Sequence, residues 1–277
     1  MWILSSYEIL EKSVFKRRDH FKDASAAHSD QAYGLLSRKS GKMAEVNWKT
    51  INLLAEDIPK ETISKAKDVY VTEHRLQIKP YDVFYRKAIP PAGVLATHQE
   101  MLLLHGMRFK SQTWLELNTI NLLAAMGHMV IAIDIPGYGE SSKEHVPESE
   151  RGEFLHQLIK SLHLAHPIII SPSLSGSFTV PLLNSHPEQF GGYIPVAPIK
   201  TGLLTHDEYK KMKVPTLIIY GDRDKELGNE STDNLKNIPT SQVQMLQNAG
   251  HPAYLDQPEI FHKLVFNFIK IVESANY

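Results

Sequence analysis

Short apolar runs that alternate with helical patterns constrain the fold of this chain more than any other feature. Each run has the length of a strand and is apolar at nearly every position, which does not suit a sheet with one face in water. The runs are residues 101–104, 129–134, 167–171, 193–197, 216–220 and 243–246. Strands of this kind predict a mostly parallel sheet that helices cover on both faces.

The segments between and after these runs have the spacing of covering helices. Residues 152–164 and 260–272 each place their apolar side chains on one helical face. Upstream, residues 69–78 and 82–89 alternate as the two strands of an antiparallel hairpin. Strands that alternate with helices predict the α/β fold class.

Residues 1–65 lack this pattern and predict an N-terminal extension to a domain at 66–277. Residues 1–42 hold eight Lys and Arg against five Asp and Glu, a mild basic excess. The run Lys16-Arg17-Arg18 suits either an anionic-surface or targeting patch or the solvated face of a mobile segment. We expect the extension to be poorly structured or helical, and to be the part that would bind a protein partner.

Composition excludes several classes of site. The chain has no cysteine, which rules out thiol nucleophiles, disulfides and zinc–thiolate sites. The formal net charge of -1 gives no overall field for nucleic acid, so no nucleic-acid partner is expected. Fourteen histidines are scattered without metal-ligand spacing, and no metal site is expected.

Hydropathy argues against stable insertion in a membrane. No segment approaches the ~20 consecutive apolar residues that a spanning helix needs. The start, "MWILSSYEIL", lacks the basic region of a signal peptide, and Glu8 interrupts its apolar residues. We expect a soluble, cytoplasmic protein, with the nucleus as a second location.

The stretch "ISPSLSG", residues 170–176, places a serine where a strand gives way to a helix. A sharp strand-to-helix turn presents a nucleophilic serine in the pattern Gly-x-Ser-x-Gly. Here Ser173 has the central position, and Ser171 and Ser175 replace the glycines. The stretch therefore predicts either a catalytic Ser173 or a plain Ser-Pro turn.

The rest of the chain supplies the two groups that would activate such a serine. A serine hydroxyl needs a base to take its proton, and the base needs a carboxylate to orient it. Asp224 and His251 each follow a predicted strand, in the order serine, acid, histidine. We predict that Asp224 is the acid and that Asp222 shapes the same loop through bonds to backbone.

Two further loops bear on the predicted site. The stretch "LLLHGMRF" ends a strand, and the N–H groups of Met107 and Leu174 are the expected donors to an oxyanion. We interpret His105 as a packing and loop-bracing residue. The turn "DIPGYGESS" lacks the Gly-Lys-Ser/Thr ending of a phosphate loop.

Taken together, "LLLHGMRF", "DIPGYGES", "ISPSLSG", "YGDRD" and "NAGHP" resemble the α/β-hydrolase superfamily over roughly residues 68–275. The stretches "ISPSLSG", "IPVAPI" and "AGHPAYLDQPE" are closest to the group called α/β-hydrolase domain-containing protein 14. The superfamily implies a mostly parallel eight-stranded sheet. Residues 1 to about 65 lie outside the shared core. One branch of the group carries an N-terminal membrane anchor, and because the first residues here lack a long enough apolar run, the resemblance implies the soluble branch.

The group resemblance implies a serine hydrolase or acyltransferase that acts on small esters. It also implies that acetyl-lysine could be the acyl donor and coenzyme A the acceptor, with no cofactor required. Arg108, Lys110 and Lys143 would suit an anionic cofactor or would be ordinary solvated charges.

Residues 198–215 are too short for a large cap, so we expect small acyl groups, from acetyl to butyryl. A non-catalytic binding or interaction scaffold is the alternative, because a fold alone does not determine function. Peptide or carbon–carbon bond hydrolysis would use the same three groups.

Overall fold

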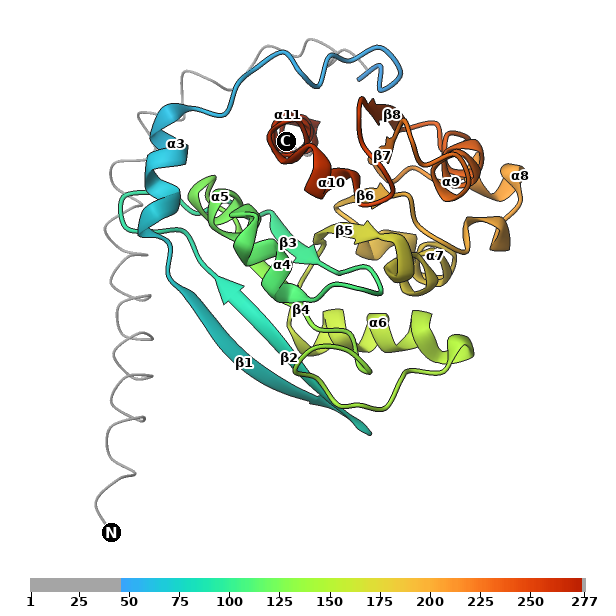
Figure 1. Cartoon of the computed structure of the whole chain (residues 1–277), viewed down its shortest axis with the longest axis horizontal. Coiled ribbons are helices and arrows are strands. Elements are labelled where there is room, and N and C mark those ends of the chain that lie inside the picture. Colours follow the sequence, from blue (N-terminus) through green and yellow to red (C-terminus); the bar gives the residue numbers. More distant parts are fainter. Residues whose placement is uncertain (1–45, 276–277) are drawn as a thin grey trace, which may run out of the picture. The chain divides into compact units, whose positions relative to one another are not determined.

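An eight-stranded sheet organises residues 46–275 (Figure 1). The computed structural model describes residues 46–275. Along the sheet the order is β1-β2-β4-β3-β5-β6-β7-β8. The strands are β1 (Val71–Ile78), β2 (Tyr81–Ala88), β3 (Glu100–Leu103), β4 (Met129–Ile133), β5 (Ile168–Pro172), β6 (Gly192–Val196), β7 (Thr216–Gly221) and β8 (Ser241–Leu246).

Most neighbouring strands are parallel. From β4 through β3, β5, β6 and β7 to β8, every pair runs in the same direction. The hairpin of β1 and β2 is antiparallel, and β2 joins β4 antiparallel. The carboxyl ends of β3 to β8 therefore share one edge of the sheet, where loops of α/β proteins carry functional side chains.

Helices cover both faces, and alternate residues of each strand point to opposite sides. In β3, Met101 and Leu103 join one apolar cluster with helices α4, α5, α10 and α11, whereas Leu102 joins the other with α6 and α7. The helices are α3 (Lys60–Lys65), α4 (Ser111–Glu116), α5 (Thr119–Ala125), α6 (Arg151–Ser161), α7 (Gly176–Ser185), α8 (His206–Tyr209), α9 (Leu227–Leu235), α10 (Ala253–Asp256) and α11 (Pro258–Ala275). Short 3₁₀ helices are η2 (Ala66–Asp68), η3 (Glu148–Glu150), η4 (Ser173–Ser175), η5 (Pro187–Gln189) and η6 (Thr201–Leu203).

This architecture confirms the predicted fold class. Every predicted strand is present, with ends that differ by one or two residues. Between β6 and β7 the chain forms only η6 and α8, so the cap is minimal, as expected. Helix α7 tolerates Pro181 in its interior.

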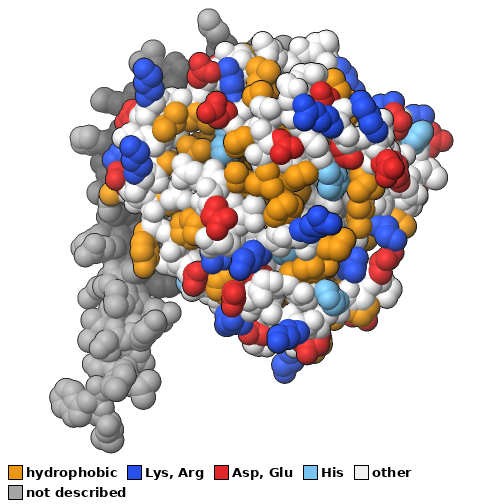
Figure 2. Space-filling model, in the orientation of Figure 1, with side chains coloured by type: hydrophobic (Ala, Val, Ile, Leu, Met, Phe, Trp, Pro, Cys, Tyr) orange, Lys and Arg blue, Asp and Glu red, His pale blue; other side chains and the backbone are white. Residues whose placement is uncertain are grey.

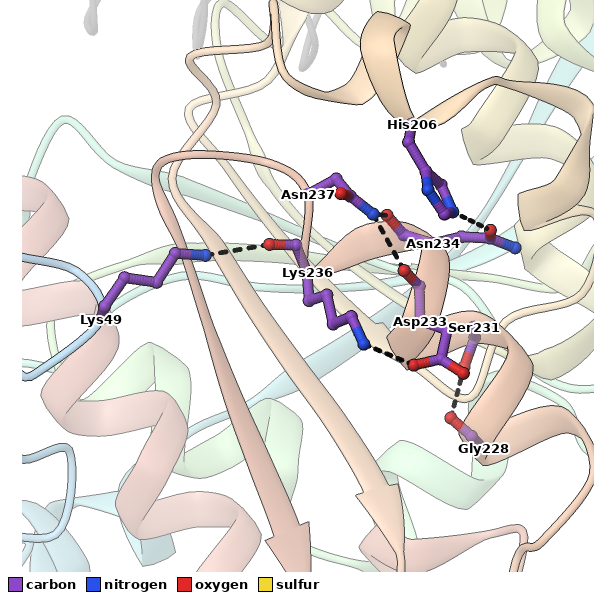
Figure 3. Close-up of polar contacts among 8 residues, drawn as sticks. All are labelled: Lys49, His206, Gly228, Ser231, Asp233, Asn234, Lys236 and Asn237. Carbon is purple, nitrogen blue, oxygen red and sulfur yellow. Dashed lines mark hydrogen bonds and ion pairs between the residues drawn. The ribbon is translucent and has the colours of Figure 1, made fainter.

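Residues 46–57 lie across β8 and α11, although the sequence pattern there is weak. Trp48 is 7% exposed and packs on Phe268, with ring centroids 5.8 Å apart. The ammonium of Lys49 donates to the carbonyl of Lys236 (3.0 Å; Figure 3). It also donates to the carbonyl of Ile238 (3.1 Å), and burial lowers the pKa of Lys49. Residues that pack on the core of the sheet domain therefore begin, within the described residues, no later than Trp48.

The boundary expected between residues 65 and 66 stays a prediction. Residues 1–45, with the basic run Lys16-Arg17-Arg18, lie outside the described residues.

Charges of both signs are mixed over the face seen in Figure 2, with apolar side chains between them. Within residues 46–275, no helix combines the length and the apolar character needed to cross a membrane.

The packing of Trp48 predicts a measurable loss of stability. Trp48→Ala should lower the free energy of unfolding by about 3 kcal/mol, because it removes a large side chain buried against α11. Tyr70→Ala is the control, since Tyr70 is 80% exposed. Urea unfolding measures both, and equal midpoints for the two variants would show that residues 46–57 do not support the core.

Candidate active site

Ser173 is the first residue of η4 and occupies a strained turn directly after β5. Its φ is +49°, a left-handed value that residues other than glycine rarely adopt, so the surroundings must hold it. The N–H of Ile199 donates to its carbonyl (3.0 Å). A Cβ added at Gly176 would lie 2.4 Å from the Ile199 carbonyl oxygen, so α7 can begin here only because residue 176 has no side chain. The turn presents Ser173 at the carboxyl end of β5.

The structure brings Ser173, His251 and Asp224 together. The Nε2 atom of His251 lies 2.8 Å from Ser173 Oγ, and its Nδ1 lies 2.6 Å from Asp224 Oδ2. The side chain of Asp224 is 8% exposed and that of His251 is 34% exposed. An acid accepts the proton of Nδ1, so Nε2 is left as the base that faces the serine hydroxyl. Side chains from the loops after β5, β7 and β8 thus form one hydrogen-bonded chain.

Asp222 lies near this chain but makes different contacts. Its Oδ1 accepts the N–H of Ala249 (3.0 Å), and its own N–H donates to the carbonyl of Leu246 (2.9 Å). Hydrogen bonds from the N–H groups of Asn248 and Ala249 lower the pKa of Asp222, although burial opposes them. Asp222 therefore holds the loop that carries His251, and Asp224 is the carboxylate that reaches the imidazole.

Gly221 lets these two loops meet. A Cβ at this position would lie 2.2 Å from the Gly250 carbonyl oxygen and 2.3 Å from that of Ala249. Any larger residue at the end of β7 would push the histidine loop away.

His105 holds the loop that follows β3. The N–H of Ile135 donates to His105 Nε2 (2.9 Å), which leaves Nδ1 protonated to donate to the Gly106 carbonyl (2.8 Å). Burial lowers the pKa of His105, so the ring is neutral. In a trans peptide the C=O and N–H point in opposite directions. A Gly106 carbonyl held toward His105 therefore turns the N–H of Met107 away from it.

The turn "DIPGYGESS" braces the same loop from the next strand. Asp134 is fully buried and accepts the N–H of Ser111 (2.7 Å) and the N–H of Glu140 (2.8 Å). A Cβ on Gly139 would lie 2.0 Å from Asp134 Oδ2, so this residue must be glycine. Gly139 therefore leaves room for the buried carboxylate that ties the start of α4 to the loop after β4.

The two other predicted positions lie at the same edge of the sheet. Met107 is 61% exposed on the loop after β3, and Leu174 is 7% exposed in η4 directly after the serine. Their N–H groups as oxyanion donors stay a prediction.

Thr179 and Tyr193 belong to this site, although the sequence analysis did not single them out. Their hydroxyls join those of Ser171 and Ser175 beneath the turn. One available signal was the four-residue spacing of Ser175 and Thr179 at the start of the helix predicted after the serine. The second available signal was Tyr193, a tyrosine in a predicted strand that is otherwise apolar.

Other candidate sites in the described part of the chain are weaker. A groove of about 970 Å³ lies at the opposite edge of the sheet, lined by residues that precede β3, β5, β6 and β7, including Gln99, His166 and Val214. No predicted site residue lines it. Among residues 46–275, no three His, Asp or Glu side chains are grouped so that they could hold a metal ion.

Comparison with known proteins identifies relatives over most of the described residues. No family model matches the chain. "Putative protein-lysine deacylase ABHD14B" of Pongo abelii is 40% identical over 209 residues, which cover 74% of this chain and 98% of the relative. The human protein of the same name is 39% identical over 209 residues, with the same coverage. "Protein ABHD14A" of Rattus norvegicus is 40% identical over 190 residues, covering 68% of this chain and 77% of the relative.

Solved structures with the same fold include several hydrolases. A predicted CIB-like hydrolase from Thermoplasma acidophilum has a TM-score of 0.65 and 25% identity, covering 73% of this chain and 98% of its own. Carboxylesterase CesB from Bacillus subtilis has a TM-score of 0.60 over 76% of this chain and 95% of its own, and at 18% identity it supports the fold alone. Since ABHD14B is about 40% identical over nearly its whole length, the chain belongs to the ABHD14 family of α/β-hydrolases.

Proposed function

We propose that this protein is a serine hydrolase that removes small acyl groups through a covalent ester on Ser173. The observation that carries the proposal is the chain of hydrogen bonds from Asp224 through His251 to Ser173 Oγ. A serine held in a strained turn and bonded to an imidazole is the arrangement that nucleophilic catalysis needs.

The proposed reaction has two halves. His251 Nε2 takes the proton of Ser173 while Oγ attacks the acyl carbonyl carbon, and a tetrahedral oxyanion forms. The imidazolium then gives this proton to the leaving amine or alcohol as its bond to the acyl carbon breaks. In the second half His251 activates the acceptor in the same way, and Ser173 is released. Asp224 keeps the imidazole in the tautomer that both halves require.

The oxyanion needs donors placed before it forms. We propose the N–H groups of Met107 and Leu174, which lie on the loop after β3 and directly after the nucleophile. The bond from His105 to the Gly106 carbonyl supports this assignment, because it sets the direction of the next N–H.

The proposed substrate is a small acyl group on an amine or ester, with acetyl-lysine as the leading candidate. The name of the ABHD14B relatives supports a lysine acyl group. The minimal cap of η6 and α8 supports a short acyl chain, since it offers little apolar wall to enclose a long one.

Water is the proposed acceptor, and the thiol of coenzyme A is a second one. The cationic side chains of Arg108, Lys110 and Lys143 are exposed on the loops after β3 and β4, where they fit the phosphates of such an acceptor. When bound, coenzyme A would supply a thiol that takes the acyl group in place of water. The expected cytoplasmic and nuclear location, and a protein partner through the N-terminal extension, remain part of this proposal.

A fluorophosphonate probe tests the proposed function. The wild type should gain one phosphonyl group on Ser173, because only an activated serine reacts at low probe concentration. Ser173→Ala should gain none, whereas Ser185→Ala, at the other end of α7, should label as wild type does. Intact-protein mass spectrometry measures the three, and an unlabelled wild type would instead support a non-catalytic scaffold.

The minimal cap predicts the preferred acyl length. Among p-nitrophenyl esters, kcat/KM should be highest for acetyl to butyryl and should fall by about tenfold or more for dodecanoyl, since no apolar wall covers a long chain. Hydrolysis rates across the series measure this. A preference for the long esters would contradict the proposed substrate class and would leave the nucleophile unaffected.

A further inference from the structure

We propose that a buried chain of hydroxyl groups positions the nucleophile. Two of these hydroxyls belong to the serines that replace the glycines usually found on either side of it. The chain consists of Tyr193, Thr179, Ser171 and Ser175, here called the hydroxyl clasp. The inference rests on the proposed function, because it concerns how Ser173 is held for reaction.

The clasp joins the two sides of the turn. Ser171 lies on β5 before the nucleophile, and Ser175 lies in η4 after it, yet their Oγ atoms are only 3.1 Å apart. The Thr179 hydroxyl, one turn further along in α7, lies 2.8 Å from Ser171 Oγ. A hydrogen bond between residues 171 and 175 therefore closes the turn directly behind Ser173.

Each of the four hydroxyl groups can donate one hydrogen bond if all of them donate in the same direction along the chain. In that arrangement the Tyr193 hydroxyl donates to Thr179 (2.9 Å), Thr179 to Ser171, and Ser171 to Ser175. The Thr179 hydroxyl also lies 3.2 Å from the Ser175 carbonyl oxygen, a second acceptor in the same turn. Ser175 then donates to the carbonyl of Pro172 (2.7 Å). That carbonyl belongs to the peptide bond whose nitrogen is that of Ser173. The chain thus ends on the peptide plane that sets the nucleophile's backbone.

Burial restricts the hydroxyl clasp to one hydrogen-bonded arrangement. All four side chains are fully buried, where an unpaired hydroxyl is costly and a fully paired network favours one arrangement. Burial also raises the pKa of Tyr193 to about 12, so the phenol stays neutral and keeps its proton to donate. Tyr193 is on β6, so the clasp ties the strained turn to the neighbouring strand as well as to α7.

The clasp also accounts for the departure from Gly-x-Ser-x-Gly. Glycines allow close approach of strand and helix, but they add no contacts. Ser171 and Ser175 leave nearly as much room and add a bond across the turn. The helix backbone comes closest to its neighbours at Gly176 instead, where a Cβ would collide with the loop after β6.

Thr179 allows a test that leaves the catalytic groups intact. Thr179→Val keeps the shape and removes the hydroxyl that joins Tyr193 to Ser171. We expect kcat for a short ester, and the rate of fluorophosphonate labelling, to fall by roughly tenfold or more with KM unchanged, because small displacements of a reacting atom are costly. Thr179→Ser restores a hydroxyl and should recover most of the rate.

The control is Thr216→Val, the same change at another fully buried threonine. Thr216 Oγ1 donates to the carbonyl of Val214 (2.8 Å) at the start of β7, at the far edge of the sheet. This variant should lose a similar amount of thermal stability and keep the wild-type rates within about twofold, since it displaces no reacting atom. If Thr179→Val does not fold, Tyr193→Phe removes the first donor of the clasp and carries the same expectation.

The two proposals fail in different ways. Suppose that the wild type labels and that Thr179→Val and Tyr193→Phe hydrolyse the ester and label at the same rates as Thr216→Val. That result would overturn the clasp and would leave the proposed serine hydrolase intact. A wild type that does not label would overturn the hydrolase and, with it, the reaction for which the clasp positions Ser173.

Discussion

The hydrogen bonds that His251 makes to Asp224 and Ser173 are the constraint on which the rest of this structure depends. Neither bond is local, because the three residues come from loops after β5, β7 and β8. A parallel sheet brings these loops to one edge, since its strands all end on the same side. The apolar strands, covered on both faces by helices, therefore serve to hold three polar side chains within hydrogen-bond distance.

Close approach of backbones makes the convergence possible. Gly221 admits the histidine loop beside the end of β7, and Gly176 admits the start of α7 beside the loop after β6. Both would collide with neighbouring carbonyls if they carried a side chain. At Ser173 the same crowding appears as a left-handed φ, and the hydroxyl clasp and the Ile199 N–H hold it. Contacts from β5, β6 and α7 together therefore hold the strained backbone conformation of Ser173.

Much of the fold could be predicted because its signals are local. The strands are continuous apolar runs, and the positions of Ser173, Asp224 and His251 follow from the strands before them. The distinction between Asp222 and Asp224 also followed from position, since the residue closer to the strand end bonds backbone. The N–H that its carboxylate accepts belongs to Ala249 in the histidine loop, however, and not to its own loop as predicted.

Contacts between distant residues with weak patterns could not be predicted. Trp48 packs on Phe268, and Lys49 bonds the segment before β8, yet residues 46–57 show no periodicity that points to either contact. The hydroxyl clasp was missed for the same reason. Ser171 and Ser175 looked like small substitutes for glycine, and only the fold brings Tyr193 beneath them.

The paired substitutions Asp224→Asn and Asp222→Asn test the central claim most directly. Both remove one negative charge from the same loop and keep a side-chain oxygen that can accept a hydrogen bond. Asp224→Asn should lower kcat for a short ester by roughly 10³–10⁴-fold, because the imidazole loses the partner that sets its tautomer. Asp222→Asn should cost less than about tenfold, since its bond to the Ala249 N–H survives. Equal losses, or full activity of Asp224→Asn, would contradict the assignment of Asp224, His251 and Ser173 as one catalytic unit.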